Sequence, residues 1–194
     1  MKIIRPESNQ PIPESAKRVY KGQIFEVYEW PQKLFDGSVE TFEKIKRPDT
    51  VGVIPITDEG KILLAEQEQP GTVPFVGLIS GRMEEGEDPL TTIKREFLEE
   101  AGYEAREYKL WIAEQLTNKI DWAAYIFIAN GLKRVSEPNL DSGEKSKLLE
   151  VGFDEFIKLT AQDNFRDFGM IRELYKIINK PSGLDSLKKL FGVR

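Results

Sequence analysis

Glutamates gather in the middle of the sequence, at Glu96, Glu99 and Glu100, directly after Arg95. Spacings of three and four residues bring side chains together on a helix, so we expect the three carboxylates within an arc of roughly 100°. Like charges at these spacings each destabilise a helix by a few tenths of a kcal/mol, and Arg95 can pair with only part of the cluster. A hard divalent cation binds several carboxylate oxygens at once. The pattern therefore indicates a metal site, with a solvated acidic helix face as the alternative.

The element that positions these glutamates is a predicted helix over residues 89–101. Asp88 is a good N-cap and Pro89 suits the first helical position, while Gly102 favours a left-handed stop after the last turn. On a helical wheel the apolar side chains form one stripe that should face a core, made of Leu90, Ile93, Phe97 and Ala101. The glutamates lie beside this stripe, at the edge of the buried surface.

The loop before the helix completes a longer pattern. Gly81, five residues, Glu87, seven residues and then REFLEEAGY over 95–103 resembles the Nudix box at every fixed position. Such a long motif is far more specific than a lone glycine loop. The resemblance implies an α/β fold, a Nudix-type α/β/α sandwich with a mixed sheet, in which the loop–helix–loop is the box. It implies hydrolysis of a nucleoside diphosphate linked to another group, with Mg²⁺ (or Mn²⁺) as cofactor.

The resemblance also implies roles for individual residues. Glu96 and Glu100 would be the main metal ligands, and Glu99 a further ligand or the partner of Arg95. Glu87 would support the site or bind an additional ion, and the carbonyl of Ser80 matches a metal ligand of the family. As catalytic residues we expect Glu99, Glu144 and Arg95, and as substrate-binding residues Gly81, Arg82, Gln67 and Trp30.

The flanking sequence resembles the ADP-ribose and nucleotide-sugar pyrophosphatase branch, through residues 47–53 and the strands before them. In that branch the N-terminal strands build a dimer and part of the substrate pocket, so we expect a homodimer. Three departures leave ADP-ribose itself open as the substrate. Gln67 and Gln69 fall where the branch has an Arg-Gln-x-Arg element, so both of its arginines are absent. The branch's Glu-x-Pro-x-Gly is replaced over 77–81, and no proline follows the box within residues 103–121. Nucleoside triphosphate hydrolysis, RNA decapping and a non-catalytic nucleotide sensor are the alternatives.

The chain contains no histidine, so a general base must be a carboxylate, Lys, Tyr or metal-bound water. In the branch that this sequence resembles, a glutamate on a mobile loop beyond the box serves as the general base. The matching loop is 136–145, and its spacing from residues 151–155 favours Glu144 over Glu137 and Asp141. The alternative is an ordinary solvated loop acid.

Composition sets further limits. The 194 residues carry a formal net charge of −5 and contain no cysteine. Disulfides, thiolate zinc sites and cysteine nucleophiles are therefore excluded, and a broad nucleic-acid surface is not expected. The N-terminus lacks the apolar segment of a signal peptide, and the longest apolar run, around 122–129, is too short to span a bilayer. We expect a cytoplasmic protein that acts on a small nucleotide and binds no membrane.

Local patterns divide the chain into four parts. We expect a mobile arm over 1–16, an N-terminal β subdomain over 17–47 and a Nudix domain over 48–180, followed by a C-terminal tail over 181–194. Alternation predicts strands at 18–30 and 39–46, which would form a small antiparallel sheet around the Asp36-Gly37 turn. Further strands are expected at 51–56, 61–65, 75–80, 108–114, 123–129 and 148–153, with helices after Asp154 and up to Pro181.

Overall fold

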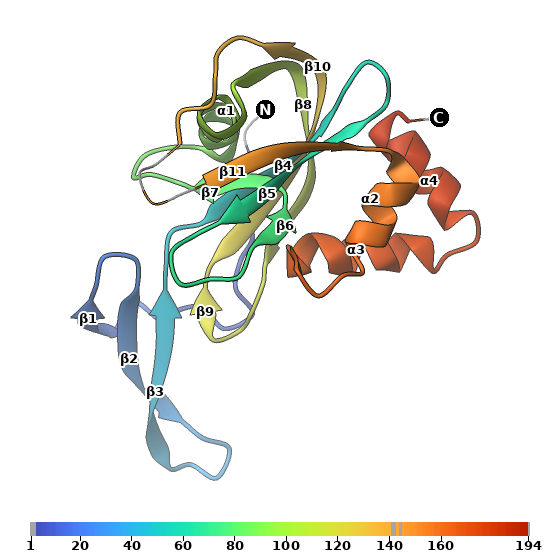
Figure 1. Cartoon of the computed structure of the whole chain (residues 1–194). Helices are drawn as coiled ribbons and strands as arrows, with labels where there is room; N and C mark the ends of the chain where they lie inside the picture. Colours follow the sequence, from blue (N-terminus) through green and yellow to red (C-terminus); the bar gives the residue numbers. More distant parts are fainter. Residues whose placement is uncertain (1–2, 141–142, 144, 194) are drawn as a thin grey trace.

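The computed structural model describes residues 3–140, 143 and 145–193, which form two sheets and four helices (Figure 1). Within these residues the larger sheet has eight strands. Six lie in the order β12 (Phe165–Arg166), β6 (Phe75–Gly77), β5 (Ile62–Glu68), β4 (Thr50–Ile56), β10 (Ala123–Arg134) and β8 (Tyr103–Gln115). The other two, β7 (Ile79–Arg82) and β11 (Lys145–Val151), pair with β4 and β5.

The larger sheet is mixed, and β4 lies at its centre. It runs parallel to β10 and antiparallel to β7, while β8 runs antiparallel to β10. Six of the seven residues of β4 are buried, which is why its sequence is an almost continuous apolar run rather than an alternating one. Central strands of this kind form when both faces of a sheet are covered.

Helices cover the two faces, and each face has its own apolar core. On one face α1 (Pro89–Ala101) packs through Ile93 and Phe97 against Val53 and Phe127. On the other face lie α2 (Phe153–Leu159), α3 (Phe168–Ile178) and α4 (Gly183–Phe191), which pack together on one side of the molecule in Figure 1. The arrangement is an α/β/α sandwich, so the predicted fold is confirmed.

The small sheet projects away from the rest of the molecule (Figure 1). Its strands lie in the order β1 (Lys17–Lys21), β2 (Glu26–Lys33), β3 (Val39–Lys46) and β9 (Ile120–Asp121). Strand β9 comes from the larger domain and pairs in parallel with the end of β3 at Ile45 and Lys46. This short pairing connects the small sheet to the loop between β8 and β10.

Several element bounds differ from those predicted. The expected strand 18–30 is two strands, because the Gly22 amide donates to the Phe25 carbonyl and turns the chain between β1 and β2. Strand β5 continues to Glu68, beyond the predicted end at residue 65, since it pairs there with β11 at Lys145. The tail forms the full helix α4, whose Leu187 and Phe191 are completely buried in the second core.

The N-terminal segment, predicted to be a mobile arm, contacts both sheets. Arg5 forms ion pairs with Asp49 (2.7 Å) and Asp121 (3.0 Å). Lys44 is 2% exposed, and its ammonium donates to Ser8 Oγ and to the Gln10 carbonyl, each at 2.6 Å. The division of the chain at residues 16, 47 and 180 stays a prediction. Among the described residues, none of the helices combines the length and apolar character needed to cross a membrane.

Candidate active site

Helix α1 carries the acidic cluster and has the predicted bounds. Asp88 Oδ1 accepts hydrogen bonds from the amides of Leu90 (2.9 Å) and Thr91 (3.2 Å), which caps the first turn. Gly102 ends the helix with a φ of 72°, and its amide donates to the Leu98 carbonyl. Because Ile93, Phe97 and Ala101 are buried on the sheet, the helix is fixed in rotation and its glutamates point along one edge of the sandwich.

Arg95 lies at the centre of this cluster. Its Nε and Nη2 donate to the two carboxylate oxygens of Glu87, each at 3.0 Å. Its Nη1 donates to Glu96 at 2.9 Å and to Glu99 at 3.1 Å, the pair expected from the i, i+4 spacing. A guanidinium offers five donors in a fixed plane, so one side chain can hold three acids in defined positions. The same contacts lower the pKa of the Glu87 carboxyl to about 2.

The Glu96 carboxylate packs against the backbone of Gly81. A Cβ atom on residue 81 would stand 1.9 Å from Glu96 Cδ and 2.1 Å from its Oε1, so the acid occupies space that only a glycine leaves free. Burial raises the pKa of the Glu96 carboxyl, although the neighbouring Arg95 acts in the opposite direction. Gly81 therefore has a steric role, which is to let a carboxylate of α1 approach β7.

Glu100 connects the same helix to the residue before Gly81. The Ser80 amide donates to Glu100 Oε2 at 3.4 Å. Glu96 and Glu100 thus lie over two consecutive residues of β7, and the Ser80 carbonyl proposed as a metal ligand belongs to this strand segment. The structure places four of the five predicted ligand residues, 80, 96, 99 and 100, along one wall of the same cavity, and Glu87 lies behind them on Arg95.

These residues offer the oxygen ligands that a divalent cation prefers. Among the described residues, however, no three acidic side chains converge on one point as they would around a metal ion. Instead, the guanidinium of Arg95 lies among Glu87, Glu96 and Glu99. The donor chemistry fits a divalent cation, and Arg95 holds the acids beside one another through its ion pairs.

The cluster forms one wall of an open cavity of about 1270 Å³. Seven of the predicted site residues line it: Ser80, Gly81, Arg82, Arg95, Glu96, Glu99 and Glu100. A second wall comes from the starts of β4 and β10 and from the start of α3, and includes Thr50, Gly52, Trp122, Ala124, Arg166, Asp167 and Arg172. The cavity therefore extends well beyond the box.

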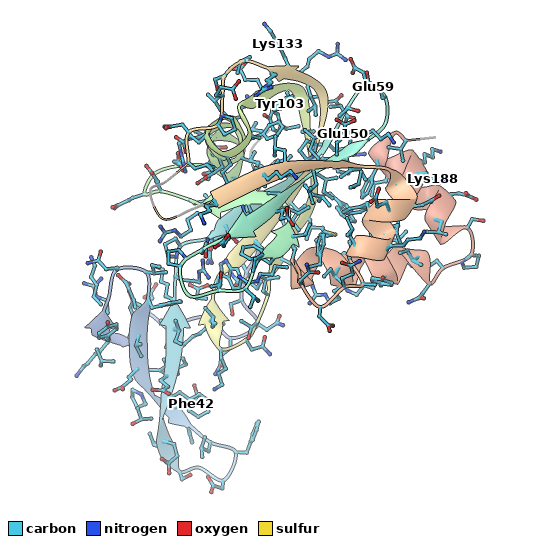
Figure 2. All side chains as sticks on the ribbon, viewed as in Figure 1. Phe42, Glu59, Tyr103, Lys133, Glu150 and Lys188 are labelled. Atoms are coloured by element: carbon cyan, nitrogen blue, oxygen red, sulfur yellow. The ribbon has the colours of Figure 1, made fainter. Side chains whose placement is uncertain are left out.

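Two predicted substrate-binding residues lie elsewhere. Gln67 is inside β5, paired with β6 and β11, and its neighbour Gln69 lines the cavity instead. Trp30 is 5% exposed, and the centre of its ring lies 6.2 Å from the centre of the Phe42 ring. Phe42 is labelled on the small sheet in Figure 2. Trp30 lines a separate cavity of about 450 Å³ between the small sheet and the N-terminal segment.

The predicted base Glu144 lies outside the described residues. The loop that leads to it approaches the site, because the Asn139 amide donates to the Glu99 carbonyl at 2.7 Å. Asn139 and Leu140 both line the cavity. The start of the loop is therefore attached to the C-terminal turn of α1.

Arg47 is a cavity residue that the sequence did not reveal. Its guanidinium lies 4.5 Å from the centre of the Trp122 ring, and Trp122 Nε1 donates to Thr50 Oγ1 at 3.0 Å. Arg47 Nε is buried without a hydrogen-bond partner in the described structure. Burial lowers the pKa of Arg47, and the positive charge of Arg82 lowers it further. Two arginines that approach each other in a cavity form a suitable anion site.

Comparison with known proteins identifies the family. The NUDIX domain model matches residues 46–174, which include the box and both walls of the cavity. The chain belongs to the Nudix family. Two relatives are each 30% identical over 156 residues. One is a methanol dehydrogenase activator of Bacillus methanolicus, matched over 78% of this chain and 84% of that protein, and the other is an ADP-ribose pyrophosphatase of Bacillus subtilis strain 168, matched over 79% of this chain and 84% of that protein.

The fold has a counterpart among solved structures. The crystal structure of an ADP compounds hydrolase superimposes with a TM-score of 0.69 and 18% sequence identity, over 96% of each chain. The fold likeness therefore includes the small N-terminal sheet as well as the Nudix domain. The predicted family and its ADP-ribose pyrophosphatase branch are confirmed, and so is the predicted class of enzyme, a Nudix pyrophosphatase.

Proposed function

We propose that this Nudix enzyme hydrolyses the diphosphate bond of a nucleoside diphosphate linked to a second group, in a reaction that depends on Mg²⁺, with Mn²⁺ as a substitute. The observation that carries the proposal is the single cavity that contains the box acids on one wall and further polar residues on the other. Its volume suits a substrate with a group on each side of the diphosphate. ADP-ribose and nucleotide sugars are such substrates, and the names of two relatives support an ADP compound.

In this proposal Glu96, Glu99 and Glu100, with the Ser80 carbonyl, would hold the metal. A bound divalent cation supplies charge screening for the diphosphate, polarises a phosphoryl oxygen and lowers the pKa of water. Arg95 orients the Glu96 and Glu99 carboxylates, and Glu87 fixes Arg95 to the loop before the helix. Gly81 leaves the space that the Glu96 carboxylate needs.

The phosphates would be held by the arginines of the cavity. Arg47 and Arg82 both line it, and the Nε of Arg47 has no partner among the described groups. Phosphate oxygens accept from a guanidinium in a bidentate manner, so a diphosphate between these two side chains would satisfy the buried donor. Trp122, stacked on Arg47, would form a flat surface beside it.

We keep Glu144 as the proposed general base, with Glu99 as the box residue that would take this role in its place. The contact of Asn139 with the end of α1 brings the loop toward the cavity and supports this assignment. A carboxylate that removes a proton from water contributes about 10²–10⁴-fold to the rate. The Glu144→Gln variant should lose that factor in kcat.

We also propose that the small sheet forms a homodimer, in a protein of the cytoplasm. All five residues of β1 are exposed, and this strand forms one edge of the sheet. Large apolar side chains on the small sheet and its turns are exposed, among them Val19, Tyr20, Phe25, Phe35 and Val39. An isolated sheet of this size is marginal, and a second copy would cover these side chains.

Product analysis with a substrate panel tests the proposed reaction. The protein is incubated with Mg²⁺ and ADP-ribose, ADP-glucose, other nucleotide sugars, a dinucleotide or nucleoside triphosphates, and the products are separated by chromatography. We expect a nucleoside monophosphate and a phosphorylated second group from at least one diphosphate substrate. Hydrolysis of triphosphates alone would contradict the proposal and favour a triphosphate pyrophosphohydrolase. Nucleotide binding without any product would favour a sensor.

A further inference from the structure

The second wall of the cavity is centred on the first turn of α3. Arg166, Asp167, Gly169 and Arg172 line the cavity there, together with Gly52 and Ala124 of the sheet. Glycine and alanine at these positions leave a hollow in front of the helix. The proposed function gives no role to Arg166, Asp167 or Arg172, which line this end of the cavity.

Asp167 is the N-cap of α3, and one of its two carboxylate oxygens caps the helix. Its Oδ1 accepts from the Met170 amide at 2.9 Å. No described residue donates a hydrogen bond to Oδ2. This second oxygen points toward the sheet, where it lies 3.9 Å from the position that a Cβ on Gly52 would occupy.

Capping of α3 does not explain why residue 167 carries a second carboxylate oxygen. Asn and Ser cap a helix about as well as Asp does. Burial, and to a smaller extent the nearby Glu114, raise the pKa of the Asp167 carboxyl to about 6, so the ionised acid is unfavourable at this place. A partly buried carboxylate with a free acceptor inside an active-site cavity is a candidate for substrate recognition.

The neighbours of Asp167 limit what it would bind. Arg172 forms an ion pair with Glu114, and Arg166 lies 3.8 Å from the centre of the Phe75 ring, so two guanidinium groups flank the site. Glu114 balances the charge of Arg172, and the guanidinium of Arg166, which also lines the cavity, disfavours an amine or another cation. An ionised carboxylate in turn repels phosphate, and it can only accept hydrogen bonds. Uncharged hydrogen-bond donors therefore remain as partners. In sugars these donors are hydroxyl groups, from which carboxylates commonly accept hydrogen bonds.

We infer that Asp167 is a specificity-determining residue, whose Oδ2 accepts hydrogen bonds from the hydroxyls of a sugar in the substrate. The inference rests on the proposed function for the location of the diphosphate at the box. Both halves of such a substrate carry a phosphorylated sugar, the nucleoside on one side and the second group on the other. The chemistry at Asp167 is the same for either half.

Binding measurements with four probes test this inference without turnover. Ribose 5-phosphate is compared with n-butyl phosphate, which lacks the hydroxyls, and AMP is compared with 2′,3′-dideoxy-AMP. The Kd of each probe is measured by titration with NMR detection, for the wild-type protein and for Asp167→Asn. The Asn side chain keeps an oxygen for the Met170 amide and presents an NH₂ group where Oδ2 stood. Asp154→Asn, at an exposed position in the first turn of α2, is the matched control.

We expect the wild-type protein to bind the hydroxylated member of at least one pair about 10- to 100-fold more tightly, the range for hydrogen bonds to a charged acceptor. Asp167→Asn should lose this ratio, whereas Asp154→Asn should keep it. Loss of the preference in the ribose 5-phosphate pair shows that Asp167 binds the second group. Loss of the preference in the AMP pair shows that it binds the nucleoside.

The inference is overturned if the wild-type protein shows no preference in either pair, or if Asp167→Asn keeps the preference. A folded Asp167→Asn protein is verified by its circular dichroism spectrum and melting temperature. A wild-type preference that depends on Asp167, in a protein that cleaves no diphosphate, would contradict the proposed reaction and leave the sugar site standing. The two proposals can therefore fail separately.

Discussion

The carboxylate of Glu96 occupies the space in which a side chain on Gly81 would stand. This relationship gives the glycine at the start of the box a physical reason. Residue 81 does not have a positive φ, so an alanine there meets no backbone strain. Its only effect should be to displace an acid of α1.

We predict that Gly81→Ala lowers kcat by about 10²-fold or more, because displacement of a catalytic group by about 1 Å has an effect of this size. Steady-state kinetics with the best substrate of the panel measures it. Gly152→Ala is the control, since residue 152 has a φ of −75° and the nearest atom to its added Cβ is Lys61 Nζ at 3.9 Å. Equal kcat values in the two variants would show that the position of Glu96 does not matter.

The Arg95–Glu87 pair should contribute to stability as well as to the site. Both oxygens of Glu87 accept from Arg95, and both side chains are mostly buried. A double-mutant cycle with Arg95→Lys and Glu87→Gln, followed by urea unfolding, should give a coupling free energy of about 1–2 kcal/mol. The exposed Arg134–Glu137 pair, at 2.7 Å, is the control and should couple by less than about 0.5 kcal/mol. Similar couplings for the two pairs would contradict the assigned role of Arg95.

Much of the box could be predicted from the sequence because its signals are local. The Asp88 cap and the Gly102 stop act within one turn of α1, and the helix bounds follow from them. The alternating segment 39–46 is likewise strand β3 with unchanged bounds. In each case the residues that decide the structure are neighbours in the chain.

The second wall could not be predicted, since its residues meet only through the fold. Arg47 stacks on Trp122 because each precedes one of the parallel neighbours β4 and β10, and Asp167 lies against Gly52 of the sheet. The ion pairs of Arg5 with Asp49 and Asp121 have the same origin. The aromatic ring of Trp30 indicated a substrate contact, but no local signal in the sequence reveals which of the two cavities this ring lines.

Asp167 should make stability depend on pH in an unusual direction. Its folded-state pKa of about 6 exceeds the ordinary 3.8, so between these values the folded protein binds more protons than the unfolded chain. This acid therefore stabilises the fold less as pH rises from about 4 through 6. The free energy of unfolding of Asp167→Asn relative to wild type should increase by about 1–3 kcal/mol between pH 4 and 7.5. A difference that does not change with pH would contradict the burial of an acid here.

The small sheet should mediate association. Light scattering at micromolar concentration should give a mass near twice that of the 22.2 kDa chain. Val19→Lys, which places a charge on the exposed edge strand β1, should weaken this dimer. Val73→Lys, at an exposed position outside the small sheet, should leave it unchanged. A wild-type monomer under these conditions would remove the proposed interface.

In the proposed reaction the carboxylates on α1 hold a divalent cation for diphosphate cleavage. The Mg²⁺-dependent kcat of Glu96→Gln and Glu100→Gln, measured with the best diphosphate substrate, tests this role. Both variants should keep the wild-type fold by circular dichroism, because removing one charge eases the repulsion in the cluster. We predict that kcat falls by several orders of magnitude in each. Near-normal turnover in both folded variants would contradict the assignment of the metal site to this helix.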